Sequence, residues 1–356
     1  MCKYLSNDEI WSYGFSYNIA TGLIPYKDFN MVITPLFSIL SSKFLILFGK
    51  NIVVFHIFNA IICTTIFYFM KKEIPKSYYI LYAIFLFFSL PNYNFFCILL
   101  LYILMTLENR KSNDYIIGII LGLTFLTKQN IGIYLCIPTL FIKDIKKIIK
   151  RIIGFIIPNL IILIYLLNND CLYEFIDYTF LGVSEFAKEN LLIRPSVIIS
   201  YIYIVYKYIK TKDIKLIYLF CFELLVFPLI EQYHVMIAII PTLGYFFNTL
   251  KLNKKIIKFA FIIFITTIFS INIYAIYKEE YTLPNKTSEF KYRKIAYYED
   301  IIISDITNYM NNIDDELYVI SGMAYLLKLE ANISINKYDL LNNGNLGKNG
   351  AEKIIR

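Results

Sequence analysis

Acidic side chains near the start of the chain are the residues best suited, by type and spacing, to do chemistry. Asp8 and Glu9 are adjacent, and Asp28 follows within the same polar segment, residues 7–36. Carboxylates beside a membrane surface can accept a proton from a hydroxyl or amine, or can ligate a divalent cation next to a phosphate. No spacing in this segment identifies a metal, so we assign none. The structural alternative is that Asp8 caps a helix and Glu9 lies in its first turn.

A second group of residues offers positive charge and hydrogen-bond donors to a phosphate. Lys128 interrupts two apolar runs, and the amides of Gln129 and Asn130 follow it directly. A lysine can bind phosphate as a point charge, and the structural alternative is a side chain that extends to the membrane surface. Three further binding candidates lie at the ends of later apolar runs: Arg194, Glu231 and His234. A single histidine in such a place is more often interfacial than catalytic.

Glu223 is different because it lies inside an apolar run. A charged carboxylate at the centre of a membrane helix costs about 2.5–3.5 kcal/mol on insertion scales. We therefore expect Glu223 to face the interior of a helix bundle, to be protonated, or to mark a pathway. The alternative is a structural polar contact near Pro228, which frees a backbone carbonyl.

The first helices must position the acidic residues. A helix is predicted from Asp8 to a stop at Gly22, and a second over residues 36–48, opened by Pro35. In the first helix, Asp8, Ser12 and Ser16 fall four residues apart on one polar stripe, with apolar residues on another face. This spacing predicts amphipathic helices that lie along a membrane interface.

Composition places the chain among integral membrane proteins. Of its 356 residues, 58% are hydrophobic and only 17% are charged. The net charge of +8 comes from short clusters between apolar runs, so we exclude nucleic acid as a partner. Ten apolar runs follow the polar opening: 52–70, 78–90, 95–107, 116–127, 131–142, 152–167, 197–209, 216–230, 235–250 and 256–277. They predict a polytopic α-helical bundle of about ten spans.

Positive charge predicts the orientation of the bundle. Alternate connections carry clusters of Lys and Arg, whereas the intervening ones hold only Lys128, Lys188 and Arg194. By the positive-inside rule, the candidate site residues then lie on the extracytoplasmic face of the cell membrane. The predicted organisation is an extracytoplasmic loop with interfacial helices over 1–50, a helical bundle over 51–277 and an extracytoplasmic tail over 278–356.

The tail predicts a small α/β domain. A helix over Tyr298–Met310 is followed by a strand over Leu317–Ser321, a short helix over Gly322–Leu329 and a strand over Ile333–Ile335. These elements are too few to close a sheet comfortably. An extracytoplasmic start also lacks a preceding span to carry it across the membrane. We therefore expect the sequence to be truncated at both ends.

A family resemblance rests on several of these motifs together. The segment DEIWSYGFSYNIATGLIPYKDF followed by TPL, then KQN at an outer turn, EQYH before a span with a proline, and an α/β tail resembles the GT-C glycosyltransferases. Among them it looks most like bacterial relatives of protein O-mannosyltransferases and of the lipid A aminoarabinose transferase. The lysine that precedes the Pro-Pro-Leu turn in the aminoarabinose transferases is absent before Thr34, and Lys128 is our candidate to supply its charge.

The resemblance implies an inverting transferase that moves a sugar from a polyprenyl-phosphate carrier to an extracytoplasmic acceptor. It places Asp8 at the catalytic centre with Glu9 beside it, and it matches Asp28 to the second acidic position of the loop. Lys128, aided by Arg194 or His234, would stabilise the departing phosphate. No nucleotide is needed, which agrees with the absence of a Gly-rich phosphate loop from the sequence.

Three alternatives stay open at this point. One is a transporter or flippase of a lipid-linked sugar, in which Glu223 and Lys128 line a route. Another is an O-antigen polymerase or ligase, which would share substrates but use a larger outer loop. The third is an inactive, truncated glycosyltransferase. The sugar and the acceptor, whether lipid, polymer or protein, are not indicated by the sequence.

Overall fold

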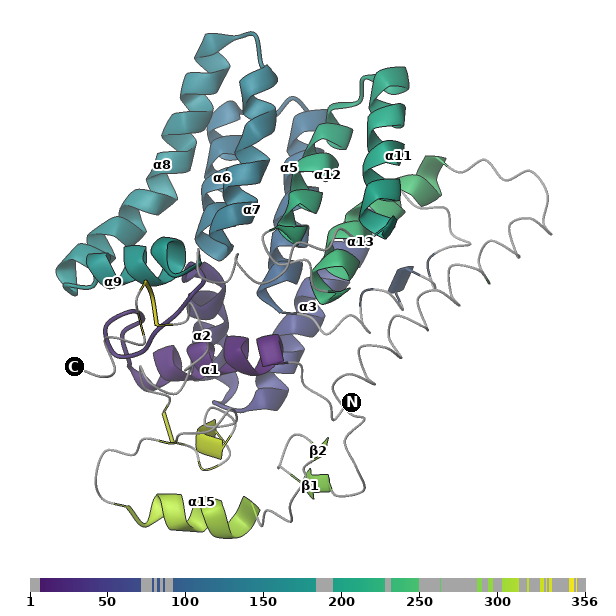
Figure 1. Cartoon of the computed structure of the whole chain (residues 1–356). Coiled ribbons are helices and arrows are strands. Elements are labelled where there is room, and N and C mark those ends of the chain that lie inside the picture. Colours follow the sequence, from purple (N-terminus) through teal and green to yellow (C-terminus); the bar gives the residue numbers. More distant parts are fainter. Residues whose placement is uncertain are drawn as a thin grey trace. The chain divides into compact units, whose positions relative to one another are not determined.

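The computed structural model of the chain is mostly helical (Figure 1). It describes residues 7–71, 79, 82–83, 86, 92–183, 195–227, 232–249, 263, 287–289, 294–296, 303–313, 319, 327–329, 331, 333–334, 346–348 and 350. The chain divides into two compact units, which we describe separately. The first comprises Met1–Phe58, Leu163–Lys188 and Tyr277–Arg356, and the second comprises Asn59–Ile162 and Glu189–Ile276.

Two helices open the first unit. Helix α1 covers Asn7–Thr21 and α2 covers Leu36–Phe48, close to the predicted bounds. Helix α1 ends where Gly22 takes a positive φ of 102°, and α2 begins after Pro35. The two helices pack together, and the Ser16 and Ser41 hydroxyl oxygens lie 2.5 Å apart at the contact.

The predicted amphipathic character of α1 is wrong. Ser12 and Ser16, which define the polar stripe, are both fully buried. The Ser16 hydroxyl donates to the Ser12 carbonyl at 2.6 Å, so the serine meets its hydrogen-bonding need within its own helix. A serine satisfied in this way can be buried, and α1 is therefore a packed helix of the first unit.

The loop between α1 and α2 is held by Tyr26. Its φ is 71°, and its amide donates to the Phe29 carbonyl at 2.9 Å. Its phenol is fully buried and donates to the Ile33 carbonyl at 2.8 Å, and its ring meets Phe175 edge-on. Burial, with smaller contributions from Cys171 and Tyr165, raises the pKa of Tyr26 well above its usual value. The hydroxyl therefore stays a donor at any physiological pH.

The rest of the first unit contains short elements. Helix α9 covers Leu172–Ile176, and a π-helical turn, η3, covers Asp177–Leu181. In the tail, β1 (Thr287–Glu289) pairs antiparallel with β2 (Lys294–Ala296), and α15 covers Ile303–Asn311. Helix α15 covers the part of the predicted helix that the structure describes, since residues 298–302 lie outside the described residues, and residues 327–329 are helical. Residues 333 and 334 are not in a strand, and the other predicted strand lies almost wholly outside the described residues.

The second unit is a helix bundle in which α5, α6, α7 and α12 lie side by side (Figure 1). The bounds are α5 Tyr93–Asn109, α6 Asp114–Thr127, α7 Gln129–Cys136, the 3-10 helix η2 Ile137–Phe141, α11 Pro195–Thr211, α12 Ile214–Glu223, the 3-10 helix η4 Leu224–Val226 and α13 Gln232–Thr249. Among the described residues, the side chains of Asn92, Asn113 and Asp213 cap the N-termini of α5, α6 and α12, respectively. Each accepts a backbone N–H two residues on, as capping residues typically do.

Two helices contribute residues to both units, and both are long and apolar enough to cross a membrane. These are α3, Ile52–Met70, and α8, Ile145–Asn168, and they are the two helices in the described part of the chain that meet both criteria. Helix α3 has the predicted bounds, whereas α8 begins seven residues before the predicted run. Many apolar side chains of α8 are exposed: Ile149, Ile152, Ile153, Ile156, Ile157, Leu160, Ile161, Leu163, Ile164 and Leu167. A long helix with such a face is typical of contact with lipid.

Small residues allow α6 and α8 to approach closely. Gly118 and Gly122 lie four residues apart on α6, a small-xxx-small spacing. A Cβ atom on Gly118 would lie 2.1 Å from the Arg151 carbonyl oxygen, and one on Gly154 of α8 would lie 2.2 Å from the Tyr115 carbonyl oxygen. A Cβ atom would clash with the opposite backbone at these positions, so the glycines let the N-terminal halves of the two helices cross closely.

Candidate functional site

The candidate site in the second unit is built around Lys128. This residue separates α6 from α7, and its φ of −153° and ψ of 114° show that the chain is extended there. Its ammonium donates to the Asn94 side-chain oxygen at 2.9 Å and lies 5.2 Å from the centre of the Tyr93 ring. Lys128 is only 9% exposed. The structure thus buries this cation and does not extend it to the surface.

Two buried asparagines lie at the start of α5, and the second of them accepts the hydrogen bond from Lys128. Asn92 and Asn94 are fully buried, and the Asn92 side-chain oxygen caps α5 by accepting the Asn94 N–H at 2.9 Å. Their NH₂ groups have no hydrogen-bond partner in the part of the chain that the structure describes. We call Asn92, Asn94 and Lys128 the Lys128 cluster. Its ammonium, two amide donors and helix N-terminus all favour an anion.

Gln129 and Asn130 continue from Lys128 into the first turn of α7. Gln129 is buried, and the Asn130 side-chain NH₂ donates to the Phe227 carbonyl at 3.3 Å. The Asn130 side-chain oxygen accepts the Ile131 N–H, so this residue ties α7 to the end of η4. Asn130 is therefore a positioning residue. His234, in the first turn of α13, is 8% exposed, which differs from the interfacial position expected of it.

The acidic candidates belong to the first unit, and the structure gives them different surroundings. Glu9 is buried, and its carboxylate lies 3.1 Å from Nε2 of His56 on α3. Asp28 is partly exposed, and one of its oxygens accepts the Ile24 N–H at 2.7 Å, which leaves the other oxygen for a ligand. The Asp8 side chain, Arg194 and Glu231 lie outside the described residues.

The predicted residues therefore fall into two groups. Lys128, Gln129 and Asn130 lie together in the second unit, and Glu9 and Asp28 lie in the first. The sequence analysis missed His56. It lies 47 positions after Glu9, and no local pattern links the two residues. Within the described ranges, no group of three or more His, Cys, Asp or Glu side chains could hold a metal ion.

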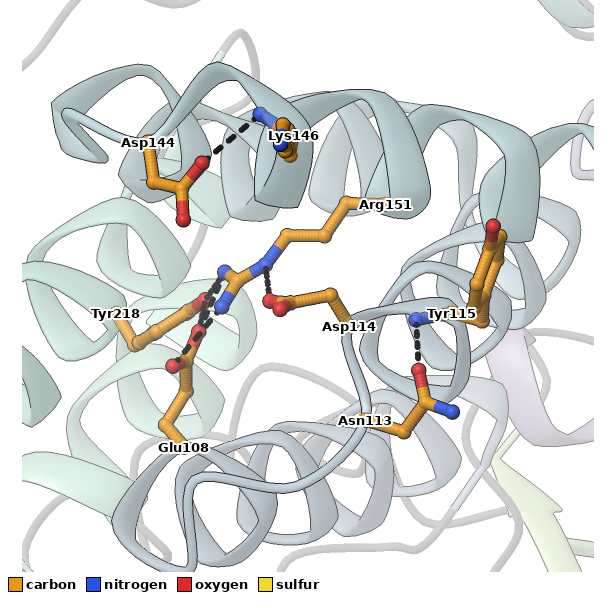
Figure 2. Close-up of polar contacts among 8 residues, drawn as sticks. All are labelled: Glu108, Asn113, Asp114, Tyr115, Asp144, Lys146, Arg151 and Tyr218. Carbon is orange, nitrogen blue, oxygen red and sulfur yellow. Dashed lines mark hydrogen bonds and ion pairs between the residues drawn. The ribbon is translucent and has the colours of Figure 1, made fainter.

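The sequence analysis also missed an ion-pair network that links four helices of the second unit (Figure 2). The Arg151 guanidinium of α8 donates to both oxygens of Glu108 on α5 at 2.6 and 3.1 Å, and through Nε to Asp114 on α6 at 2.8 Å. The Tyr218 hydroxyl of α12 donates to Glu108 at 2.6 Å. We call these four residues the Arg151 network. Every charged group in it is paired, so it positions helices and leaves no group for a ligand.

Comparison with known proteins adds no relative. No family model matches the chain, and no match was found among curated proteins or solved structures.

Proposed function

We propose that the chain is a membrane glycosyltransferase that transfers a sugar from a polyprenyl-phosphate donor to an extracytoplasmic acceptor. The observation that carries the proposal is the Lys128 cluster: a buried ammonium donates to Asn94, and the buried NH₂ groups of Asn92 and Asn94 have no hydrogen-bond partner among the described residues. A phosphate accepts hydrogen bonds through several oxygens and carries the opposite charge. The exposed apolar face of α8 supports a membrane setting, where the prenyl chain would be dissolved.

In the proposed reaction, an acceptor oxygen or nitrogen attacks the anomeric carbon with inversion. The bond from that carbon to the phosphate oxygen breaks, and polyprenyl phosphate leaves with the electron pair. The acceptor's proton passes to a carboxylate, for which Asp8 is proposed from the resemblance and Asp28 from its partial exposure. The Lys128 ammonium stabilises the charge that develops on the departing phosphate. Because Glu9 is buried against His56, we assign it to positioning α1.

The finer topology belongs to the same proposal. We propose a multi-pass bundle of about ten spans over residues 51–277, with the acidic loop of residues 1–50 and an α/β tail over residues 278–356 on the extracytoplasmic face. The charge bias of the connections supports this orientation. Membrane lipids and an acceptor of unassigned class are then the remaining partners.

Binding of the carrier tests the role of the Lys128 cluster. The purified protein in detergent is titrated with a polyprenyl phosphate or with the matching polyprenol, and its melting temperature is recorded. We expect stabilisation by the phosphate and none by the alcohol. Lys128→Met should weaken the apparent affinity for the phosphate about tenfold or more, because a hydrogen bond to a charged group contributes about 1.5–3 kcal/mol.

The matched control is Lys147→Met, which removes an exposed lysine of α8 whose side chain makes no hydrogen bond or ion pair within the described residues. This variant should bind the carrier like the unmodified chain. Equal affinity of Lys128→Met and Lys147→Met would remove the lysine from phosphate binding. A direct transfer assay with a polyprenyl-phosphate sugar then tests the acids, and full activity of both Asp8→Asn and Asp28→Asn would contradict their proposed role as proton acceptors.

One observation favours the transporter alternative. Glu223 is a buried carboxylate within the bundle, and the transferase reaction gives it no task. In vesicles, translocation of a lipid-linked sugar that stops in Glu223→Gln, without any sugar transfer by the unmodified chain, would favour a transporter or flippase over the transferase.

A further inference from the structure

Glu223 is held by hydroxyl groups from two neighbouring helices. It ends α12, and its oxygen Oε1 accepts from the Ser200 hydroxyl of α11 and from the Thr242 hydroxyl of α13, each at 2.5 Å. Helices α11, α12 and α13 pack against one another in the second unit (Figure 1). Glu223 is 1% exposed, and Ser200 and Thr242 are also buried. We call these three residues the Glu223 cluster.

No described Lys, Arg or His compensates the charge of this carboxylate. Oxygen Oε2 has no hydrogen-bond partner within the described ranges, and no Lys, Arg or His there pairs with Glu223. An ionised carboxylate removed from water and left unpaired costs several kcal/mol. The cluster therefore lacks one positive charge, which no described residue supplies.

The backbone around Glu223 favours a cation as well. Helix α12 ends at Glu223. The chain then forms the 3-10 turn η4 and becomes extended at Phe227. The carbonyl end of a helix carries partial negative charge, which disfavours a carboxylate anion and favours a cation. Interrupted helices with carboxylate and hydroxyl oxygens near their ends are the kind of place where membrane proteins bind Na⁺ or a proton.

We propose that the Glu223 cluster is a binding site for one monovalent cation, a proton or Na⁺. Carboxylate and hydroxyl oxygens are hard ligands, which suit these cations and do not favour zinc or copper. The cation neutralises Glu223 and holds α11, α12 and α13 together. This proposal does not rest on the transferase reaction, and its tests measure binding without activity.

Other titratable groups near the site must be considered when pH is varied. On the packed elements these are the Tyr201 hydroxyl of α11, the Cys221 thiol of α12 and the Tyr134 hydroxyl of α7, while His234 of α13 lies eight residues before Thr242. The charged side chains of the same helices lie toward their other ends: Lys207, Lys210, Lys215 and the N-cap Asp213. Lys215 is eight residues from Glu223, about 12 Å along a helix. The comparison with Glu223→Gln removes the contribution of all these groups.

The first test is labelling by dicyclohexylcarbodiimide, an apolar reagent that reacts with protonated carboxyl groups, followed by mass spectrometry of Glu223. We expect labelling that falls as the pH rises from about 5 to about 9. If Na⁺ is the ligand, NaCl at about ten times its Kd should lower labelling about tenfold at fixed pH, whereas choline chloride should not. If the ligand is the proton, labelling should follow pH alone. Glu108, which is paired with Arg151, should stay unlabelled and is the internal control.

The second test does not depend on access of the reagent to the site. Melting temperatures of the unmodified chain and of Glu223→Gln are compared over the same pH range, in NaCl and in choline chloride. An ionised, unpaired carboxylate is unfavourable, so the unmodified chain should lose stability relative to Glu223→Gln as the pH rises. NaCl should reverse this loss only if Na⁺ binds. The proposal is overturned if neither pH nor NaCl changes the labelling of Glu223 or the difference between the two melting temperatures.

Discussion

Replacement of Arg151 by methionine is the sharpest test of how the second unit is held together. Arg151 donates three hydrogen bonds to two carboxylates, and its side chain is 5% exposed while those of Glu108 and Asp114 are each 14% exposed (Figure 2). Methionine preserves much of the apolar stem but removes the cation. Two nearly buried carboxylates are then left without a positive partner.

The magnitude follows from this loss of pairing. Removal of one partner from a buried ion pair costs about 3–5 kcal/mol, mostly because the other charge stays buried and unpaired. For a unit of this size, that cost corresponds to a fall in melting temperature of roughly 6 °C or more. The melting temperature of Arg151→Lys should lie between those of the unmodified chain and Arg151→Met, because a lysine keeps the charge but cannot bridge two carboxylates as a guanidinium does.

A thiol-reactive dye that fluoresces on reaction can follow unfolding, because Cys63, Cys97 and Cys221 are free and buried in the second unit. Lys147→Met is the control and should change stability by about 0.5 kcal/mol or less. Neutralising both acids in the Arg151→Met background, with Glu108→Gln and Asp114→Asn, should recover part of the loss. The reasoning fails if Arg151→Met melts like Lys147→Met, or if the triple variant is less stable than the single one.

Three further outcomes are expected. In Gly118→Ala, the new methyl group would meet the Arg151 carbonyl at 2.1 Å, so α6 and α8 must separate, and dye-monitored unfolding should show a loss of about 1–3 kcal/mol. Tyr26→Phe leaves a buried carbonyl without its donor, and chemical denaturation should register a similar loss of about 1–3 kcal/mol. Asp28→Asn keeps an oxygen for the Ile24 N–H, so its melting temperature should match that of the unmodified chain while sugar transfer falls.

Helix positions were predicted best where local signals end an apolar run. Helices α2 and α3 have the expected bounds, because Pro35 opens α2 and Gly49, with a φ of 116°, ends it. Helix α8 begins earlier than its apolar run because lysine and arginine are good helix formers, and Asp144 accepts the Lys146 N–H at 3.0 Å. Hydrophobicity alone cannot locate such a start.

Burial of polar residues was predicted less well, because it depends on partners far away in the chain. Lys128 was selected as a binding candidate because it interrupts two apolar runs. Its burial could not be predicted, because its partner Asn94 lies 34 residues earlier. Tyr218 lies 110 residues from Glu108, and neither residue type identifies the other. The serines of α1 were misplaced because a serine that bonds its own helix backbone no longer needs water.

The buried polar groups of the second unit differ in how far the described residues satisfy their hydrogen bonding. The Arg151 network pairs each charge with another side chain, so its stabilisation of four helices explains it fully. Pairing does not explain Glu223, because its second oxygen has no partner in the described part of the chain. The same is true of the NH₂ groups of Asn92 and Asn94. Apolar residues of similar shape would cost less at these positions if stability were their only role. Since buried polar groups are nearly always bonded, the physical expectation is that a ligand supplies the missing partners, an anion beside Lys128 and a cation beside Glu223.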